Sequence, residues 1–371
     1  MAALRRSLAA VLLALAMVAA ACGDADDEGA DADASSSETA PSTSAAETTP
    51  PTTEAPSSTE APATTAAAEA ETRVVDSFLG EIEIPVDPQR IIALDEYAAM
   101  SLLALGIEPL ETIASYSSLV SQEILVDRGV TISEQADAFT INFEAIAASS
   151  PDVLVGNAEG AFLANMEPLD AIAPTVIVPY IEPWRDVISE TGRLFDRQAE
   201  SDRVVAAIET KIAEVAAVVE ENPLTLSVLG DTFGIVFAVS PIAVLSSVID
   251  EVGIGRPTAQ AEGEPVEGIE SVIALSTEVL GDHDADVVAV MSGVFYNAQT
   301  ITDAPTYQAL PGVQSGNDVI VDGDMWFGTH PFAIYWILED LQALALGEGA
   351  DGVGTLEDTQ QRWSDYLALV G

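Results

Sequence analysis

Apolar runs of strand length alternate with helical patterns between residues 90 and 180. The runs are RIIALD (90–95), ETIASY (111–116), PDVLVGN (151–157) and PTVIVP (174–179), and segments with a helical pattern, such as EYAAMSLLALG, lie between them. Continuous apolar strands that alternate with helices are typical of a parallel sheet covered on both faces. The pattern predicts an N-terminal α/β lobe over residues 73–197.

A long helix is predicted after this lobe. Val204, Ile208, Ile212, Val215 and Val219 recur at helical spacing, and the pattern ends at an Asn-Pro pair, so we predict one helix over 198–222. Strand-like runs then resume, as LTLSVLGD (224–231), GIVFAVS (234–240), ADVVAVMSG (285–293) and NDVIVDGD (317–324). The predicted fold is therefore α/β, with two Rossmann-like lobes that have mainly parallel sheets, joined by one long rigid helix. The C-terminal lobe and its closing helices occupy 223–371.

The N-terminus has the features of an export signal. Arg5 and Arg6 precede an apolar stretch from Leu8 to Ala20, and Cys22, the only cysteine of the chain, follows three alanines. This resembles a bacterial lipoprotein signal (1–21), although Ala19 stands where a branched residue is usual, and the resemblance implies that Cys22 is lipidated. An ordinary secretory signal with an incidental cysteine is the alternative. Residues 22–72 form an acidic Ala/Ser/Thr/Pro linker that we expect to be disordered.

The charge of the chain excludes several functions. With 61 acidic residues against 12 basic ones, the formal net charge is −49. Binding to nucleic acid or to anionic lipid headgroups is therefore not expected, because both carry negative charge. We expect an extracytoplasmic protein held at the cell membrane by its lipid anchor alone.

Four segments resemble the iron-siderophore substrate-binding proteins of ABC importers. They are GEIEIPVDPQRIIALDEYAAMSLLALGIEPLETIAS, FEAIAASSPDVLVG, DAIAPTVIV and IALSTEVLGDHDADVVAV, and they occur in the order found in that family. The resemblance implies the class III periplasmic-binding-protein fold, with the ligand between two α/β lobes. It also implies a monomeric receptor without a cofactor, which carries iron within a bound ferric siderophore and has an ABC permease and its ATPase as partners.

Ligands of open α/β sheets bind beyond the carboxyl ends of the parallel strands, and the predicted strand ends are rich in aromatic and polar residues. Core packing is the alternative for any one aromatic residue. We expect Trp184, Arg185, Tyr296 and Trp326 to contribute most, and His330 to be a ligand contact or a helix cap. His283 is expected in a solvated turn. The candidate ligand-binding residues are Tyr97, Tyr116, Trp184, Arg185, Phe233, Tyr296, Trp326 and His330.

The charges at the strand ends predict the kind of ligand. Arg185 is the one basic residue clearly at a predicted strand end, whereas Arg128 and Arg256 are in loops that the pattern does not place. The acidic residues around the proposed site are Asp95, Glu96, Glu159, Asp231 and Asp324. Close like charges repel by a few kcal/mol at an effective dielectric near roughly 20. We therefore predict a neutral or cationic ferric hydroxamate in preference to a catecholate or citrate complex.

Other ligands and other classes of protein are alternatives to a siderophore receptor. Haem, with His330 or a strand-end tyrosine as axial ligand, and cobalamin are alternatives within the same fold. A zinc or manganese receptor is not expected, because the chain has two histidines and its one cysteine is assigned to the anchor. No nucleophile elbow or phosphate-binding loop indicates an enzyme, and a surface adhesin is the remaining alternative class.

Receptors of the resembled family dock on their permease through one acidic residue in each lobe. Glu278 is the candidate in the C-terminal lobe. In the N-terminal lobe Met100 occupies the usual glutamate position, so Glu96, one turn earlier, is the candidate there.

Overall fold

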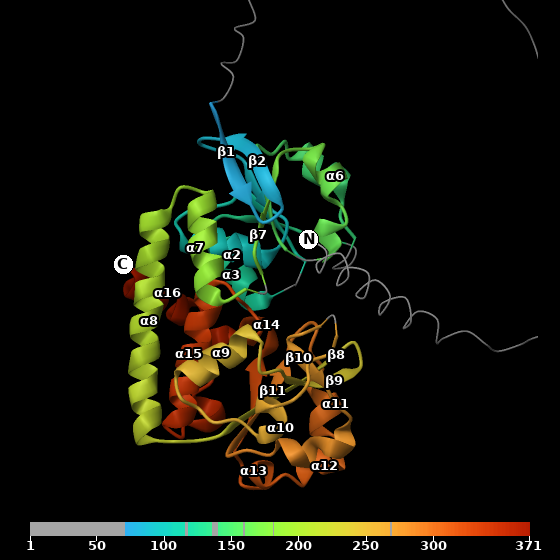
Figure 1. Ribbon diagram of the computed structural model, residues 1–371, viewed down its shortest axis with the longest axis vertical. Coiled ribbons are helices and arrows are strands. Elements are labelled where there is room, and N and C mark those ends of the chain that lie inside the picture. The colour runs from blue at the N-terminus through green and yellow to red at the C-terminus, as the bar shows by residue number, and fades with distance from the viewer. Residues whose placement is uncertain (1–70, 116–117, 136–139, 159, 181, 268) are drawn as a thin grey trace, which may run out of the picture. The chain divides into compact units, whose positions relative to one another are not determined.

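The computed structural model describes residues 71–371, except 116–117, 136–139, 159, 181 and 268 (Figure 1). The expected signal sequence, Cys22, most of the linker, Tyr116 and Glu159 lie outside the described residues. Within the described part of the chain, no helix has the length and apolarity that crossing a bilayer requires.

A hairpin and a parallel sheet form the N-terminal lobe. The hairpin consists of β1 (Thr72–Ser77) and β2 (Gly80–Pro85), which pair antiparallel. The five-stranded sheet has the order β5-β4-β3-β6-β7, and all its pairings are parallel, as predicted. Its strands are β3 (Ile91–Ala93), β4 (Glu111–Ile113), β5 (Thr131–Ser133), β6 (Val153–Asn157) and β7 (Thr175–Val178).

Helices cover both faces of this sheet because its strands are apolar on both faces. Ile91 packs in one core cluster with residues of α2, α3 and α7, and Ile92 packs in another with residues of α4, α5 and α6. Alternate residues of a strand point to opposite faces, so continuous apolar runs bury both. The helices are α2 (Glu96–Ala104), α3 (Leu119–Asp127), α4 (Phe143–Ala148), α5 (Gly160–Leu163), α6 (Met166–Asp170) and α7 (Trp184–Leu194).

The predicted long helix is confirmed as α8 (Gln198–Glu221), which Figure 1 shows as one unbroken helix. Its buried side chains include the five apolar residues that predicted it, and α8 packs against α7 and α15 (Pro331–Ala345). Lys211, the only lysine of the chain, forms an ion pair with Glu339 of α15 and donates a hydrogen bond to Gln342 Oε1 at 2.9 Å.

The second sheet is mixed, with the order β10-β9-β8-β11-β12. β8, β11 and β12 are parallel, whereas β9 runs antiparallel to β8 and to β10. The expectation of mainly parallel sheets is therefore correct for the first sheet and for three strands of the second. The antiparallel pair arises because a two-residue turn joins β8 directly to β9. The strands are β8 (Leu226–Thr232), β9 (Ile235–Val239), β10 (Val272–Ala274), β11 (Val287–Ser292) and β12 (Asp318–Asp322).

The last helix connects the two parts of the fold. α16 (Thr359–Val370) packs on α15, on α8 and on α3 of the N-terminal lobe, where Gln360 Nε2 donates to Glu123 Oε1 at 3.0 Å. The closing helices therefore do not belong to the C-terminal lobe alone. The other helical segments after α8 are α9 (Val244–Glu251), α10 (Thr258–Ala261), η1 (Thr277–His283), α11 (Ala298–Thr302), α12 (Pro305–Gln308), α13 (Pro311–Gln314), α14 (Gly323–Trp326), η2 (Gly349–Asp351) and η3 (Leu356–Asp358).

Candidate functional site

Asp95 organises the carboxyl edge of the first sheet. It follows β3 and caps α2, because its Oδ1 accepts a hydrogen bond from the Ala98 amide at 2.7 Å. Its Oδ2 accepts a second bond from the Asn157 amide at 3.0 Å, at the end of the adjacent strand β6. An N-cap carboxylate is a common way to satisfy free amides at a helix start. Here the same carboxylate also fixes the two strand ends beside each other.

Tyr97 joins this edge to the C-terminal lobe. Its hydroxyl donates to the backbone carbonyl of Asp324, in α14, at 3.0 Å. Its ring stacks on Tyr180, which follows β7, with the centroids 5.6 Å apart, and lies 5.7 Å from the His330 ring. Burial raises the pKa of Tyr97 well above its ordinary value. Residues from both lobes therefore meet around one buried phenol. Tyr97 is only 4% exposed, and its predicted contact with a ligand stays a prediction.

Asp324 is the most perturbed acid at this meeting point. Burial first, and then the like charges of Asp322 and Glu96, raise its pKa to about 7, against an opposing hydrogen bond from the Val294 amide. Carboxylates from the two lobes thus interact electrostatically across the interface. The arrangement favours the protonated acid, or a positive charge brought close to it.

Four aromatic side chains of the C-terminal lobe, which we call the C-lobe aromatic group, continue from Asp324. The group comprises Phe233, Phe295, Tyr296 and Phe327. Phe233 and Phe295 have ring centroids 5.8 Å apart, and Tyr296 and Phe327 have theirs 6.1 Å apart. A Cβ atom on Gly323 would overlap the Tyr296 ring, so a glycine is needed where α14 begins. The group forms an aromatic surface beside the acidic edge.

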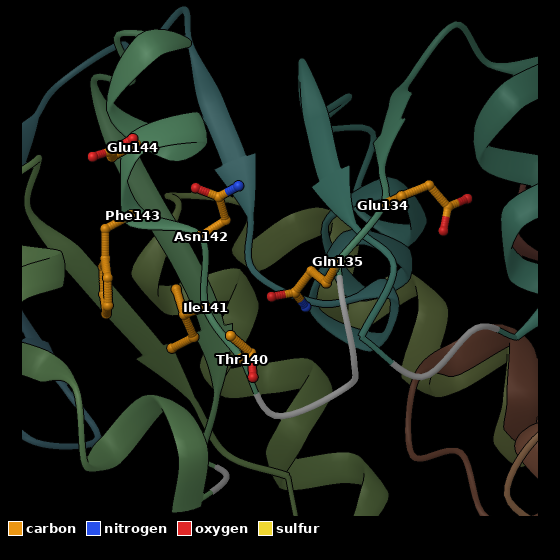
Figure 2. Close-up of a pocket in the computed structure, with 7 residues that line it drawn as sticks. All are labelled: Glu134, Gln135, Thr140, Ile141, Asn142, Phe143 and Glu144. Atoms are coloured by element: carbon orange, nitrogen blue, oxygen red, sulfur yellow. The ribbon is translucent and has the colours of Figure 1, made fainter. Parts of the chain in front are cut away.

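A pocket of about 380 Å³ lies in the N-terminal lobe, between the end of β5 and the start of α4 (Figure 2). Figure 2 shows Gln135 on one side and Ile141 and Asn142 on the other. Gln135 Nε2 donates to Ser115 Oγ at 3.2 Å, and its buried Oε1 has no hydrogen-bond partner among the described residues. The pocket is lined by Glu134, Gln135, Thr140, Ile141, Asn142, Phe143 and Glu144.

This pocket was missed from the sequence. Among the described residues that line it, the polar side chains offer amide, hydroxyl and carboxylate groups and no basic group. The one available signal was position, because Gln135 follows a strand and Asn142 caps a helix, with its Oδ1 accepting from the Ala145 amide at 3.1 Å.

The two tryptophans given most weight are core residues. Trp184 is 1% exposed where α7 begins, and Trp326 is 0% exposed, with its indole N–H donating to Asp340 Oδ2 at 2.7 Å. Both expectations of direct ligand contact are therefore wrong for this arrangement. A large apolar ring near a strand end is stabilised more by core packing than by a place at the surface.

Arg185 is paired with acids rather than directed at a ligand. Its guanidinium donates two hydrogen bonds to the Glu251 carboxylate, at 2.9 and 2.8 Å, and Nε donates to Glu209 Oε1 at 2.9 Å. Its Cζ also lies 4.1 Å from the centre of the Trp184 ring. Because Glu251 lies in α9 and Glu209 in α8, this side chain links α7 to the long helix and to the C-terminal lobe. The guanidinium is therefore occupied by acids, against the expectation that it faces a ligand.

The helix-cap alternative for His330 is confirmed. Its Nδ1 accepts a hydrogen bond from the Ala333 amide at 3.1 Å, at the start of α15. The side chain is buried, and burial lowers its pKa to about 3. The role of axial haem ligand therefore has no support in this arrangement. His283 is buried as well, in η1, so the expectation that it is solvated is wrong.

The two docking candidates differ in accessibility. Glu96 is 0% exposed, and its carboxylate accepts hydrogen bonds from the Ser115 amide and from Gln122 Nε2, both at 3.0 Å. A permease cannot reach this group, so the prediction is wrong for Glu96. Glu278 is exposed in η1 and its role stays a prediction.

The two arginines that the sequence could not place lie in other contacts. Arg128 ends α3 and pairs with Glu108, while Arg256 donates to the Val239 carbonyl and to Ser246 Oγ. Because β9 runs antiparallel to β8, Val239 lies at the opposite end of the sheet from Thr232. Arg256 therefore does not bring its guanidinium to the carboxyl edge of the second sheet.

The sequence matches a known family. The family model described as "Periplasmic binding protein" matches residues 91–324, which is well over half of the chain. The chain belongs to the periplasmic binding protein family. As a member of this family it has the class III periplasmic-binding-protein fold, and it is a binding protein rather than an enzyme.

Individual relatives agree with this family. The probable siderophore-binding lipoprotein YfiY of Bacillus subtilis (strain 168) is 25% identical over 291 residues, which covers 75% of this chain and 89% of the relative. The crystal structure of Staphylococcus aureus SirA complexed with staphyloferrin B superposes with a TM-score of 0.61 at 18% identity, covering 74% of this chain and 99% of SirA. The periplasmic catecholate-siderophore binding protein VctP of Vibrio cholerae gives 0.58 at 16%, covering 74% and 100%.

Proposed function

We propose that this periplasmic binding protein is an extracytoplasmic receptor that binds a ferric siderophore between its two lobes and delivers it to an ABC importer. The names of the relatives, YfiY and SirA among them, support the ligand class. Three features support the location of the binding site between the lobes. They are the buried meeting point around Tyr97, the C-lobe aromatic group and the pocket that contains Gln135.

The bound complex is proposed to be a neutral or cationic hydroxamate. The fold does not decide this, since VctP is named for catecholates and shares it. The observation that carries the proposal is the charge at the lobe interface, where burial and like charges raise the pKa of Asp324 to about 7. An anionic chelate would add a further like charge there, whereas a cationic chelate would be attracted.

The occupied basic side chains support the same ligand class. Anionic ferric complexes are bound best by arginines that offer bidentate donors. Arg185, the arginine that the sequence pattern placed at a strand end, already binds Glu251 and Glu209. Arg128 and Arg256 lie in the contacts described above. The carboxamides of Gln135 and Asn142, which line the pocket between β5 and α4, suit the oxygen-rich surface of a neutral chelate instead.

Calorimetric titration tests the proposal. All four tryptophans are buried, so the heat of binding is a more dependable signal than tryptophan quenching. The ferric complex of a linear trihydroxamate with a free amine is compared with an anionic ferric tris-catecholate, and the two iron-free chelators serve as controls. We expect the hydroxamate to bind more tightly, by at least tenfold, and the difference to shrink as salt is added. Tighter binding of the catecholate would contradict the ligand type, and no heat with any ferric chelate would contradict the function.

The location and partners belong to the same proposal. Cys22 is the proposed lipidation site and residues 22–72 the tether, in agreement with the lipoprotein names of relatives. The partners are an ABC permease and its ATPase, with Glu278 as an exposed docking candidate on a monomeric receptor. Mass spectrometry of the mature N-terminus tests the anchor.

A further inference from the structure

The turn between β8 and β9 contains an unusual residue. Phe233 and Gly234 are the two central residues, because Thr232 and Ile235 pair across the hairpin. Their φ angles are +51° and +80°, so both are left-handed, as a type I′ turn requires. Asn-Gly is the favoured pair in such turns, whereas a bulky residue at positive φ is an outlier. The sequence thus has a phenylalanine where an asparagine would fit the backbone better.

Burial does not offset this strain. The Phe233 side chain is 69% exposed, and its ring contacts Phe295 at a centroid distance of 5.8 Å. Two neighbouring apolar residues are also exposed, Val294 at 56% and Ile235 at 40%. Strained, exposed apolar residues of this kind gather at sites that contact ligands.

The position of the turn relates this surface to the proposed site. β8 is parallel to β11 and β12, so its end lies at the same edge of the sheet as Asp322 and α14. The segment after β11 connects the two, because Phe295 contacts Phe233 while the adjacent Tyr296 lies beside Asp324. A chain of contacts therefore leads from the strained turn through Phe295 and Tyr296 to the acidic meeting point at Tyr97.

We infer that Phe233 is a specificity-determining residue, held by the strained turn so that its ring packs on the apolar connecting chains of the bound chelate. The inference rests on the proposed function, since it names the part of that ligand which the C-terminal lobe recognises. The acidic edge attracts the positive charge of the chelate, and the Phe233 and Phe295 rings cover its methylene groups. Ferric complexes without such chains lose this contact.

The test separates strain from recognition with three substitutions. Phe233→Asn relieves the left-handed strain and removes the ring, Phe233→Leu removes the ring and keeps the strain, and Phe233→Tyr keeps both. Ser150→Gly is the matched control, because Ser150 is exposed, has a φ of +46° and lies before the amino end of β6, away from the site. Thermal unfolding and calorimetric titration with the cationic ferric trihydroxamate are measured for each.

We expect Phe233→Asn to unfold about 2–4 °C higher than the unsubstituted protein, a shift that corresponds to relief of one left-handed residue. It should bind the chelate about tenfold more weakly. Phe233→Leu should bind as weakly without the gain in stability, and Phe233→Tyr should match the unsubstituted protein in both. Ser150→Gly should gain stability and keep its affinity.

Three results would overturn the inference. If Phe233→Asn binds within twofold of the unsubstituted protein, the ring does not take part in ligand recognition. If Phe233→Asn unfolds at a lower temperature, the ring stabilises the fold as a core residue does. If binding is unchanged but uptake in cells is lost, the turn contacts the permease and not the chelate. If the unsubstituted protein binds no ferric chelate, the proposed function itself fails, and the inference fails with it.

Discussion

Asp324 should destabilise the fold at alkaline pH, and Asp324→Asn should remove that effect. Its pKa in the fold is about 7, raised first by burial and then by Asp322 and Glu96, against an ordinary value of 3.8. A raised acid pKa means that the folded state holds the proton more tightly than the unfolded chain does. Its contribution to stability is therefore complete below about pH 4 and is lost as the pH rises through 7.

The size of the effect follows from this difference in pKa. At about 1.4 kcal/mol per unit, roughly three units give an upper value of about 4 kcal/mol at pH 8. Native domains are stable by only about 5–15 kcal/mol, so this is a large change. Asparagine keeps an oxygen that can accept from the Val294 amide, and the Tyr97 bond uses the backbone carbonyl of residue 324, so both contacts survive.

Urea unfolding between pH 4 and pH 8.5 measures the prediction. Because the chain has a net charge of −49, removing any acid relieves some repulsion, and Asp303→Asn, an exposed acid of the same lobe, is the control for that general gain. We expect Asp324→Asn to exceed the control by several kcal/mol at pH 8 and to match it at pH 4. A difference that does not depend on pH would refute the assignment of the raised pKa to this carboxyl.

Two further substitutions test the corrected roles of site candidates, both by urea unfolding at pH 7. Trp326→Phe should lower the free energy of unfolding by about 1–3 kcal/mol, because Asp340 Oδ2 loses a buried N–H donor; a neutral result would show that the hydrogen bond is not important for stability. Arg185→Gln should cost no more than about 1 kcal/mol, because the side chain is 37% exposed and its ion pairs are screened; a loss of several kcal/mol would mean that this link holds the lobes together.

The architecture was largely predictable, because it is encoded in local patterns. The helix over 198–222 came from apolar residues at helical spacing, and the structure ends it one residue earlier, at Glu221. The parallel strands came from continuous apolar runs. The β8–β9 hairpin was not recognised because its turn is Phe-Gly, and the usual Asn-Gly signal is absent. Because Phe233 is not a residue that the backbone of this turn favours, the sequence pattern did not indicate a turn.

The positions of the candidate side chains were predictable only in part. Strand-end reasoning selected Tyr97 and Tyr296, which the structure places beside Asp324. The same reasoning selected Trp184 and Trp326, which are buried. Sequence gives the place of a backbone in the topology, whereas the direction of a side chain depends on which neighbours can cover it. Glu96 shows the same limit, because the amide of Ser115 turns an expected surface acid into a buried acceptor.

The single helix between the sheets affects how a transporter distinguishes a loaded receptor from an empty one. α8 has 24 residues, so at 1.5 Å per residue it is about 36 Å long, and Lys211 attaches it to α15. Hinge closure needs a few residues that absorb large dihedral changes, and a continuous hydrogen-bonded helix offers none. We therefore expect no large rotation of one lobe when a ligand binds. Under the proposed function, a permease would distinguish the loaded receptor by direct contact with the chelate and with the residues that surround it.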